Sequence, residues 1–484
     1  MKRKRIRIPI APIKGRLYFV FFIFVIALTL LGGRVYYFKT VKGAEYENRA
    51  KEQQVNRYDS MVPANRGSIV DRNNQPLAIS TVVYNVILDS RVLALKNLDE
   101  ATRKEEQDKT FNALREVFPD LDYEELEHGV QINPDTQRPY TDNSWKVLAR
   151  NVDKEIKESL EVQNLKGIFF EKSTKRTYPL KTLACHVIGF MRGDAKWGIE
   201  SYYDKYMTGT PGRSFISYDG NNTAVQMEYD AKDGDTVVTT LDYNIQQYAE
   251  EIVNNTAAQW PSEAVAIMVM NPNTGEVYAM ADSGTFDLNN PDDPMALSDP
   301  AFVETWNAMS EEEQIEYKNN MWNNFNVSST YEPGSIFKPI TVAAALEEGI
   351  ITPNQTFVCT GSVEVYDRNI RCHLRSGHGT LDVQGTLAQS CNPAMIEMAQ
   401  KMGVETFYKY QRDFGFGEKT GIDLPAEAAG ILHQFDNIGP VELATMSFGQ
   451  GFNATSVQAL TAFSAVINGG NLMKPYVVSQ VVDQ

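Results

Sequence analysis

The longest hydrophobic run in the chain lies close to its N-terminus. Residues 17–31 are almost entirely apolar, and about 17 such residues is the lower limit for a helix that spans a bilayer. The run can extend to Phe38 if the charged end of Arg34 reaches the membrane surface. We therefore expect a transmembrane anchor over residues 17–38. A cleaved signal peptide is the alternative, but no Ala-x-Ala cleavage pattern follows the run.

The polar and apolar positions that follow predict a series of short elements. Residues 42–59 are polar and favour a helical stalk. Residues 69–80 contain two short apolar strands separated by Asn73 and Asn74, which is typical of a hairpin. Residues 99–161 are highly charged and mostly helical in pattern, so we expect a solvated structural arm there.

The pattern changes at Asp242, which is placed to cap a helix over residues 243–256. Apolar strands follow at residues 263–270 and 276–281, and the Asn-Thr-Gly between them favours a tight turn. A helix beside an antiparallel hairpin predicts an α+β domain. Residues 291–320 are acidic without a clear period, and we expect an irregular external insertion there.

Composition and charge indicate how many domains the chain has and how it is oriented in the membrane. A chain of 484 residues with 43% hydrophobic and 22% charged residues is globular and long enough for two or three domains. Its net charge of −16 argues against nucleic acid as a partner. Basic residues nevertheless crowd the first sixteen positions, directly before the apolar run. This order predicts a cytoplasmic tail over residues 1–16 and a body outside the membrane.

The chain has four cysteines, which are Cys185, Cys359, Cys372 and Cys391. Cys359 and Cys372 flank a turn-rich strand pair, and an external location would permit a disulfide between them. We expect no metal or other cofactor, because no C-x-x-C spacing occurs and His373 and His378 lack an evident second pair of ligands.

The stretch EPGSIFK places Ser335 three residues ahead of Lys338, at the predicted start of a helix that ends near Gly349. Residues three apart share a helix face, so the lysine can act as a base for the serine if burial or a nearby cation keeps it neutral. The structural alternative is an N-cap serine followed by a surface lysine. A second element, Ser390-Cys391-Asn392, precedes a helix that Pro393 starts and Gly403 ends, so Ser390 and Asn392 can complete a polar constellation.

S-x-x-K followed by S-x-N is the motif order of penicillin-binding proteins. The chain resembles the class B, monofunctional penicillin-binding proteins of the division and sporulation type over nearly its whole length. The segments that carry this resemblance are RGSIVDRNNQPLA, RTYPLKTLACHVIGF, GIESYYD, TGTPG, DTVVTTLD, MNPNTGEVYAM, YEPGSIFK, SCN, FGFGEKTGIDLPAE and SFGQGFNATSVQ. It implies a membrane anchor, an elongated β-rich pedestal or dimerisation module over residues 39–240, and a transpeptidase domain over residues 241–484 with helices around an antiparallel sheet.

The resemblance also implies a D,D-transpeptidase that cross-links peptidoglycan stem peptides ending in D-Ala-D-Ala. Ser335 would form the acyl-enzyme, Lys338 would act as its base, and Ser390 and Asn392 would supply the second motif. β-Lactams would acylate the same serine. The implied partners are a membrane-embedded glycan polymerase, other wall-assembly proteins and a second copy of the chain. The alternatives are a non-catalytic wall-assembly scaffold and a β-lactam sensor, although the short basic tail leaves little room for a signalling segment.

The text of a third motif, Lys-Thr-Gly, occurs at residues 419–421. It follows Ser390 too closely, within FGFGEKTGIDLPAE, which in the resembled family is a structural loop. The family's Lys-Thr/Ser-Gly strand supplies a cation for the substrate carboxylate and an oxyanion N–H. Because no other candidate follows, we expect the transpeptidase domain to be truncated at its C-terminus.

Overall fold

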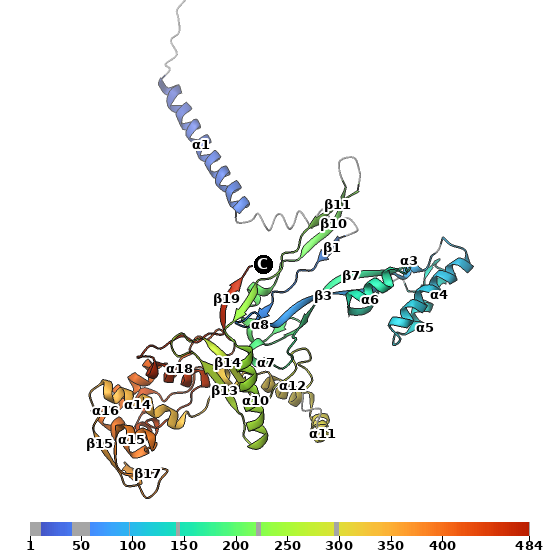
Figure 1. Cartoon of the computed structure of the whole chain (residues 1–484). Helices are drawn as coiled ribbons and strands as arrows, with labels where there is room; N and C mark the ends of the chain where they lie inside the picture. The colour runs from blue at the N-terminus through green and yellow to red at the C-terminus, as the bar shows by residue number, and fades with distance from the viewer. Residues whose placement is uncertain are drawn as a thin grey trace, which may run out of the picture. The chain divides into compact units, whose positions relative to one another are not determined.

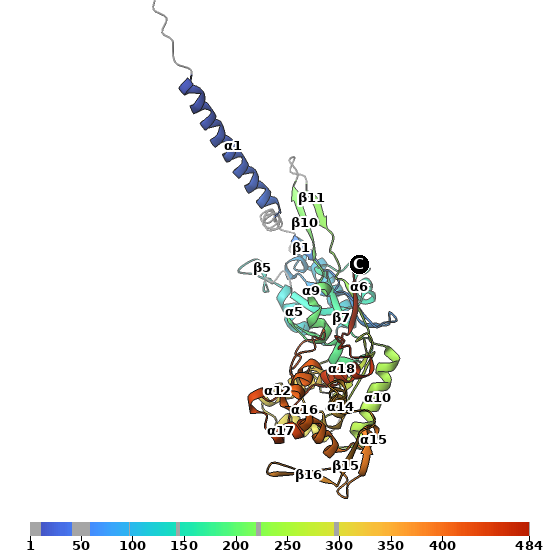
Figure 2. The same ribbon diagram turned by 90° about the vertical axis from the view of Figure 1, so that its left-hand side faces the viewer.

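The computed structural model describes residues 11–40, 59–95, 97–141, 146–218, 224–294 and 300–483. The chain divides into two compact units, each of which is described by itself. One unit holds residues 1–62 and 211–231, and the other holds residues 63–210 and 232–484. Figures 1 and 2 show the ribbon from two directions.

The first unit contains one helix and one small sheet. Helix α1 (Ala11–Thr40) covers the predicted apolar run. The sheet has the antiparallel order β1 (Asp59–Val62), β10 (Gly212–Tyr218), β11 (Ala224–Tyr229). Among the described residues, no helix meets the combined length and apolarity required to cross a membrane. The predicted stalk lies outside the described residues except for Asp59.

The second unit contains a mixed sheet that joins distant parts of the chain. Its described strands follow the order β19 (Val478–Val482), β12 (Thr236–Thr239), β2 (Ile69–Val70), β3 (Pro76–Leu88), β6 (Lys146–Val152), and β7 (Ile168–Thr177) also pairs with β3. Asn74, at φ 64°, makes the turn between β2 and β3, which confirms the predicted hairpin. Residues 478–482 therefore lie beside a strand from residues 236–239, as Figure 1 shows.

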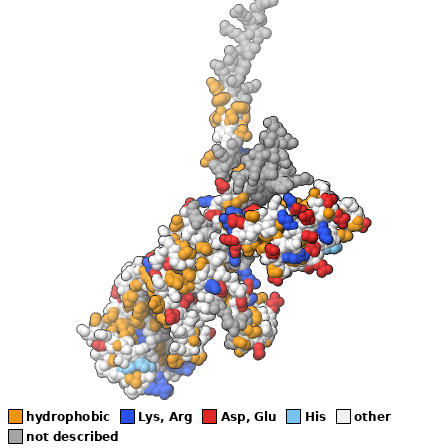
Figure 3. Space-filling view, turned by 45° about the vertical axis from the view of Figure 1, so that its right-hand side comes forward, with side chains coloured by type: hydrophobic (Ala, Val, Ile, Leu, Met, Phe, Trp, Pro, Cys, Tyr) orange, Lys and Arg blue, Asp and Glu red, His pale blue; other side chains and the backbone are white. Residues whose placement is uncertain are grey.

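The charged region before residue 161 is largely helical, as predicted. It contains α4 (Glu100–Val117), α5 (Tyr123–Val130) and α6 (Lys154–Glu161), and α3 (Ser90–Leu93) precedes it. Leu93, Phe111 and Leu114 pack against Val86 and Leu88 of β3 to form a small core. Acidic and basic side chains are mixed over the outer face of this arm in Figure 3. The surface pairs Arg115–Glu127 and Lys146–Glu125 are examples of this mixing.

Three of the sequence segments meet at one buried carboxylate. Glu200, in α8 (Gly198–Tyr202), is fully buried and accepts bonds of 2.6 Å from Arg66 Nε and from Arg176 Nε. Tyr178 OH donates to the same carboxylate at 3.2 Å. These residues belong to RGSIVD, RTYPL and GIESYYD. One ion-pair cluster therefore joins the first segment to two segments that lie more than 100 residues further along the chain.

We expect Glu200→Gln to lower the free energy of unfolding by about 3 kcal/mol, because it leaves two largely buried guanidinium groups short of a counter-charge. Asp204, which also pairs with Arg66, moderates the loss. The measurement is urea denaturation followed by circular dichroism. Glu127→Gln, in an exposed pair, is the matched control and should change stability by less than about 1 kcal/mol. Equal effects of the two substitutions would contradict the assignment.

The second half of the chain begins with the predicted helix and hairpin. Helix α10 (Tyr243–Gln259) is capped by Asp242, whose carboxylate accepts from the N–H groups of Asn244 and Ile245. It packs on the antiparallel pair β13 (Ala266–Met270) and β14 (Val277–Asp282). The Gln246 side chain bonds both the N–H and the C=O of Met280, at 2.8 and 2.9 Å, and so attaches the helix to β14.

The expectation of an irregular insertion over residues 291–320 is wrong for most of that range. Helices α11 (Pro300–Ala308) and α12 (Glu311–Met321) occupy it. Ser310 and Glu313 form a reciprocal capping box at the start of α12. That S-x-x-E pattern is the local signal that could have predicted this helix.

The remaining helices form a core around Phe337, Phe407, Phe416 and Phe452, with ring centroids 5.0–6.0 Å apart. The helices of this core are the 3-10 helix η2 (Gly334–Phe337), α14 (Lys338–Glu347), α15 (Val383–Ala388), α16 (Asn392–Asp413), α17 (Pro440–Met446) and α18 (Ser456–Ile467). The short helix α13 (Phe325–Ser328) contributes Val327 to a second core. Two hairpins accompany them, β15 (Thr356–Cys359) with β18 (Gly379–Asp382), and β16 (Ser362–Val365) with β17 (Arg368–Arg371). Shorter elements are α7 (Cys185–Ile188), α9 (Asp204–Met207), β4 (Ile132–Asn133), β5 (Arg138–Pro139), β8 (Met191–Arg192), β9 (Ala195–Lys196) and η3 (Phe435–Asn437).

Candidate active site

Ser335 lies inside a 3-10 turn rather than at the cap of an α-helix. Helix α14 begins only at Lys338, with Pro339 in its first turn. The structural alternative, an N-cap serine followed by a surface lysine, is therefore wrong, because Pro333 and Phe337 occupy the N-cap positions. The Ser335 side chain is exposed, whereas the Lys338 side chain is only 2% exposed. The exposed hydroxyl can meet a substrate, while the amine next to it is shielded from water.

The segment that carries Ser335 is attached to residues 449–454. Gly334 N–H donates to Gly449 O at 2.8 Å, and Tyr331 N–H donates to Ala454 O at 3.0 Å. A Cβ at Gly449 would lie 2.0 Å from Gly334 O, and its φ is 83°. Only glycine fits this close approach. The segments YEPGSIFK and SFGQGFNATSVQ thus act together to hold the serine in position.

Lys338 Nζ donates three hydrogen bonds, one for each of its protons. The acceptors are Ser390 O at 2.7 Å, Ser390 Oγ at 2.8 Å and Asn392 Oδ1 at 2.7 Å. Ser390 Oγ in turn donates to Ser335 Oγ at 2.9 Å. All four predicted site residues therefore come together, and Ser390 connects the lysine to the exposed serine. Burial lowers the pKa of Lys338 to about 8, because a charged amine loses its hydration there.

Ser390 and Asn392 occupy a constrained loop before α16. Ser390 has φ 46°, a left-handed conformation that is unfavourable for a residue with a Cβ. Asn392 Nδ2 donates to Arg371 O at 3.1 Å, which connects this loop to the end of β17. Gly403 breaks α16 with φ 79° and ψ 166°, at the position where the sequence predicted a helix to stop.

The text Lys419-Thr420-Gly421 lies outside helices and strands. Thr420 N–H and Oγ donate to Glu427 Oε1 at 2.6 and 2.5 Å, and Gly421 N–H donates to Glu427 Oε2 at 3.0 Å. These bonds hold residues 420–421 in a turn around the buried carboxylate of Glu427. The prediction that this segment is a structural loop is confirmed.

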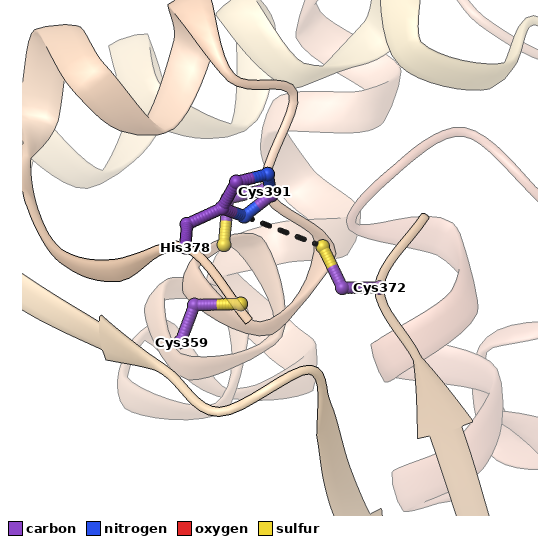
Figure 4. Close-up of side chains that lie close together, drawn as sticks. All are labelled: Cys359, Cys372, His378 and Cys391. Carbon is purple, nitrogen blue, oxygen red and sulfur yellow. Dashed lines mark hydrogen bonds between the residues drawn. The ribbon is translucent and has the colours of Figure 1, made fainter. Parts of the chain in front are cut away.

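The cysteines do not follow the expectation from the sequence. All four are free, so the disulfide considered for Cys359 and Cys372 is absent from the structure. Cys359, Cys372, Cys391 and His378 instead converge, with their ligand atoms within 4.8 Å of one another (Figure 4). The argument that His378 lacks further ligands is therefore wrong. The sequence contains no short metal-binding motif that would have predicted this cluster, because folding brings the four residues together from separate elements.

Comparison with known proteins identifies the class of fold and site. A family model described as "Penicillin binding protein transpeptidase domain" matches residues 265–484, and one described as "Penicillin-binding Protein dimerisation domain" matches residues 61–239. Stage V sporulation protein D of Bacillus subtilis is 31% identical over 99% of this chain and 68% of its own length. The probable peptidoglycan D,D-transpeptidase PenA of Neisseria meningitidis serogroup B is 27% identical over 98% of this chain and 74% of its own.

Solved structures agree on the fold. Penicillin Binding Protein 2X from Streptococcus thermophilus superposes with a TM-score of 0.68 at 23% identity, over 88% of this chain and 61% of that one. The chain belongs to the class B penicillin-binding proteins, as its motifs predicted. The predicted α+β arrangement, with a dimerisation module ahead of a transpeptidase domain, is confirmed. The relative from Neisseria meningitidis is named as a probable peptidoglycan D,D-transpeptidase.

Proposed function

We propose that this protein cross-links peptidoglycan through an acyl-enzyme on Ser335. The observation that carries the proposal is the hydrogen-bond chain from buried Lys338 through Ser390 to exposed Ser335. A serine hydroxyl needs a neighbour to take its proton. Once Lys338 is neutral, its nitrogen has a free lone pair, and the Ser390 hydroxyl can reverse its two hydrogen bonds, accepting from Ser335 Oγ and donating to Lys338 Nζ. The lysine can then take the Ser335 proton through Ser390.

The reaction uses these groups in order. Ser335 Oγ attacks the carbonyl carbon of the penultimate D-alanine, its proton passes to Ser390 Oγ, and the Ser390 proton passes to Lys338 Nζ. Backbone N–H groups at the start of a helix favour the developing oxyanion. The tetrahedral intermediate collapses, the peptide C–N bond breaks, and the departing D-alanine amine takes a proton back along the same chain. An amine of a second stem peptide then attacks the ester carbonyl, and the chain of Lys338 and Ser390 takes one of its protons. The ester C–O bond breaks as the new peptide C–N bond forms, and that proton returns to Ser335 Oγ.

Asn392 has a positioning role in this proposal. Its Oδ1 accepts from Lys338 Nζ while its Nδ2 donates to Arg371 O. The amide therefore holds the lysine amine toward Ser390 and away from solvent. The conformation of Ser390 is unfavourable by itself, so bonds on both sides of this loop help to keep the hydroxyl within reach of Ser335.

The membrane location belongs to the same proposal. A basic tail over residues 1–16 followed by an apolar run over residues 17–38 supports a single anchor with the body outside. A cross-linking enzyme acts on newly made glycan, so a membrane-embedded glycan polymerase is a fitting partner. The match to a dimerisation domain supports a second copy of the chain as another.

The test is mass spectrometry of the intact full-length protein after incubation with benzylpenicillin. We expect a mass increase of one penicillin molecule, because the opened β-lactam stays attached as an ester and loses no atoms. Proteolysis should place the adduct on the peptide that contains Ser335. A synthetic stem peptide ending in D-Ala-D-Ala should release D-alanine, and prior penicillin treatment should block that release. An adduct on any other peptide would overturn the assignment of the nucleophile.

A further inference from the structure

Three thiols and one imidazole lie close together at the second motif, whose middle residue, Cys391, is one of them. The proposed reaction uses none of the four groups. Their ligand atoms all lie within 4.8 Å of one another, and Cys372 Sγ lies 3.7 Å from His378 Nδ1. Figure 4 shows the three sulfur atoms and the ring turned toward a common centre. Cys359, Cys372 and Cys391 are each at most 3% exposed.

The backbone around the cluster is arranged to bring these side chains together. Cys359 ends β15, and the loop that carries Cys372 and His378 folds back over it. A Cβ at Gly377 would lie 2.3 Å from Cys359 O, and a Cβ at Gly361 would lie 2.0 Å from Arg375 O, with positive φ at both glycines. Only glycine permits this approach. Cys372 N–H also donates to Gly361 O at 2.9 Å.

The separations suit a metal ion better than a disulfide. Zinc bonds of about 2.3 Å to sulfur and about 2.0 Å to nitrogen, arranged tetrahedrally, place ligand atoms about 3.5–3.8 Å apart. A disulfide requires about 2.05 Å between two sulfurs, and it would use only two of the four groups. Among the described residues, His378 Nε2 is buried without a hydrogen-bond partner, and the His373 ring packs against the His378 ring with centroids 5.0 Å apart.

We propose that Cys359, Cys372, Cys391 and His378 bind one Zn²⁺ in a closed, structural Cys₃His site. Binding requires the thiols as thiolates, so the three cysteines release their protons to solvent and the imidazole binds through a neutral nitrogen. Four protein ligands fill the tetrahedral shell and leave no open position for a water nucleophile. His373, whose Nδ1 lies 3.9 Å from Cys372 Sγ, is not one of the four converging residues.

The site has a consequence for catalysis, and this step rests on the proposed function. Cys391 stands between Ser390 and Asn392, the residues that contact Lys338. A metal bond to Cys391 would restrain this loop and help to hold Ser390 at its left-handed φ of 46°. The ion would therefore join the hairpins β15–β18 and β16–β17 to the start of α16 and position the second motif without touching the substrate.

The primary test is metal content. Full-length protein purified without chelators should contain one zinc per chain by elemental mass spectrometry. Metal-free protein reloaded with Co²⁺ should give the intense visible and near-ultraviolet bands of a tetrahedral thiolate site. Cys359→Ser should weaken zinc binding by at least about 100-fold, since changes outside the ligand set alone cost about 10- to 100-fold. Cys185→Ser removes a buried free cysteine outside the cluster and should retain the zinc and the cobalt spectrum.

If the Cys359 variant fails to fold, zinc release from the wild-type protein still tests the proposal. A thiol-blocking reagent should release one Zn²⁺ per chain, detected with a chromophoric chelator. Protein that binds neither Zn²⁺ nor Co²⁺, or whose mass shows a stable disulfide within the cluster under non-reducing conditions, would overturn the proposal. Zinc bound by a protein that does not react with penicillin would leave the metal site standing and count against the proposed function instead. Zinc removal that leaves penicillin acylation unchanged would overturn the positioning role alone.

Discussion

Ser335→Ala should abolish covalent labelling by a fluorescent penicillin. The substitution removes the only hydroxyl that is both exposed and joined to Lys338 through Ser390 in the described site, so no acyl-enzyme can form there. We expect the labelling rate to fall by at least about 10⁴-fold, to the background of the gel, in line with the loss of a serine nucleophile in other acyl-transfer enzymes. The measurement is in-gel fluorescence after a timed incubation, with circular dichroism to show that the variant is folded.

Ser262→Ala is the matched control for this experiment. Ser262 is exposed and bonds only Trp260 O among its described neighbours, so its loss should leave labelling unchanged. Full labelling of the Ser335 variant would refute the assignment of the nucleophile. The scaffold alternative makes a different prediction, in which the wild-type protein itself is not labelled while its association with wall-assembly partners survives loss of Ser335.

Lys338→Met should lower the rate of acylation by about 10²–10⁴-fold, the range expected when a general base is removed. Methionine keeps most of the length of the side chain but cannot take a proton. It also leaves Ser390 O and Asn392 Oδ1 without their donor, which should cost about 1–3 kcal/mol of stability. The acylation rate is measured by stopped-flow or timed gel labelling. Lys401→Met, at an exposed lysine of α16, is the control and should acylate at the wild-type rate.

The pH profile separates a base from a purely structural lysine. Burial lowers the pKa of Lys338 to about 8, so the neutral, proton-accepting form is the minority at pH 7 and the majority at pH 9. The wild-type acylation rate should therefore rise about tenfold between pH 7 and pH 9 and then level off. The residual rate of the Lys338 variant should lack this rise. A flat wild-type profile, or the same profile in the variant, would remove Lys338 from the role of base.

Local sequence predicted much of the fold because its determinants act over a few residues. The hairpin at Asn74, the cap at Asp242 and the helix break at Gly403 each depend on the backbone preferences of one or two residues. Ser335 and Lys338 were found for a similar reason, since a short motif carries them. Errors arose where one local signal was overlooked, as with the capping box at Ser310, or where possible ligands lie in separate segments, as with His378 and the three cysteines around it.

By itself, the sequence determined the family, the order of the two matched regions and the residues from which an acyl-transfer site can be built. The tertiary structure alone decided how those residues connect. It buries Lys338, places Ser390 between the lysine and the exposed serine, and closes Lys-Thr-Gly against Glu427 as a loop. It also gathers Cys359, Cys372, His378 and Cys391 from two hairpins and a helix start. Hydrogen bonds and metal ligation depend on distances of a few ångströms between atoms, and only the packing of segments far apart in the chain sets those distances.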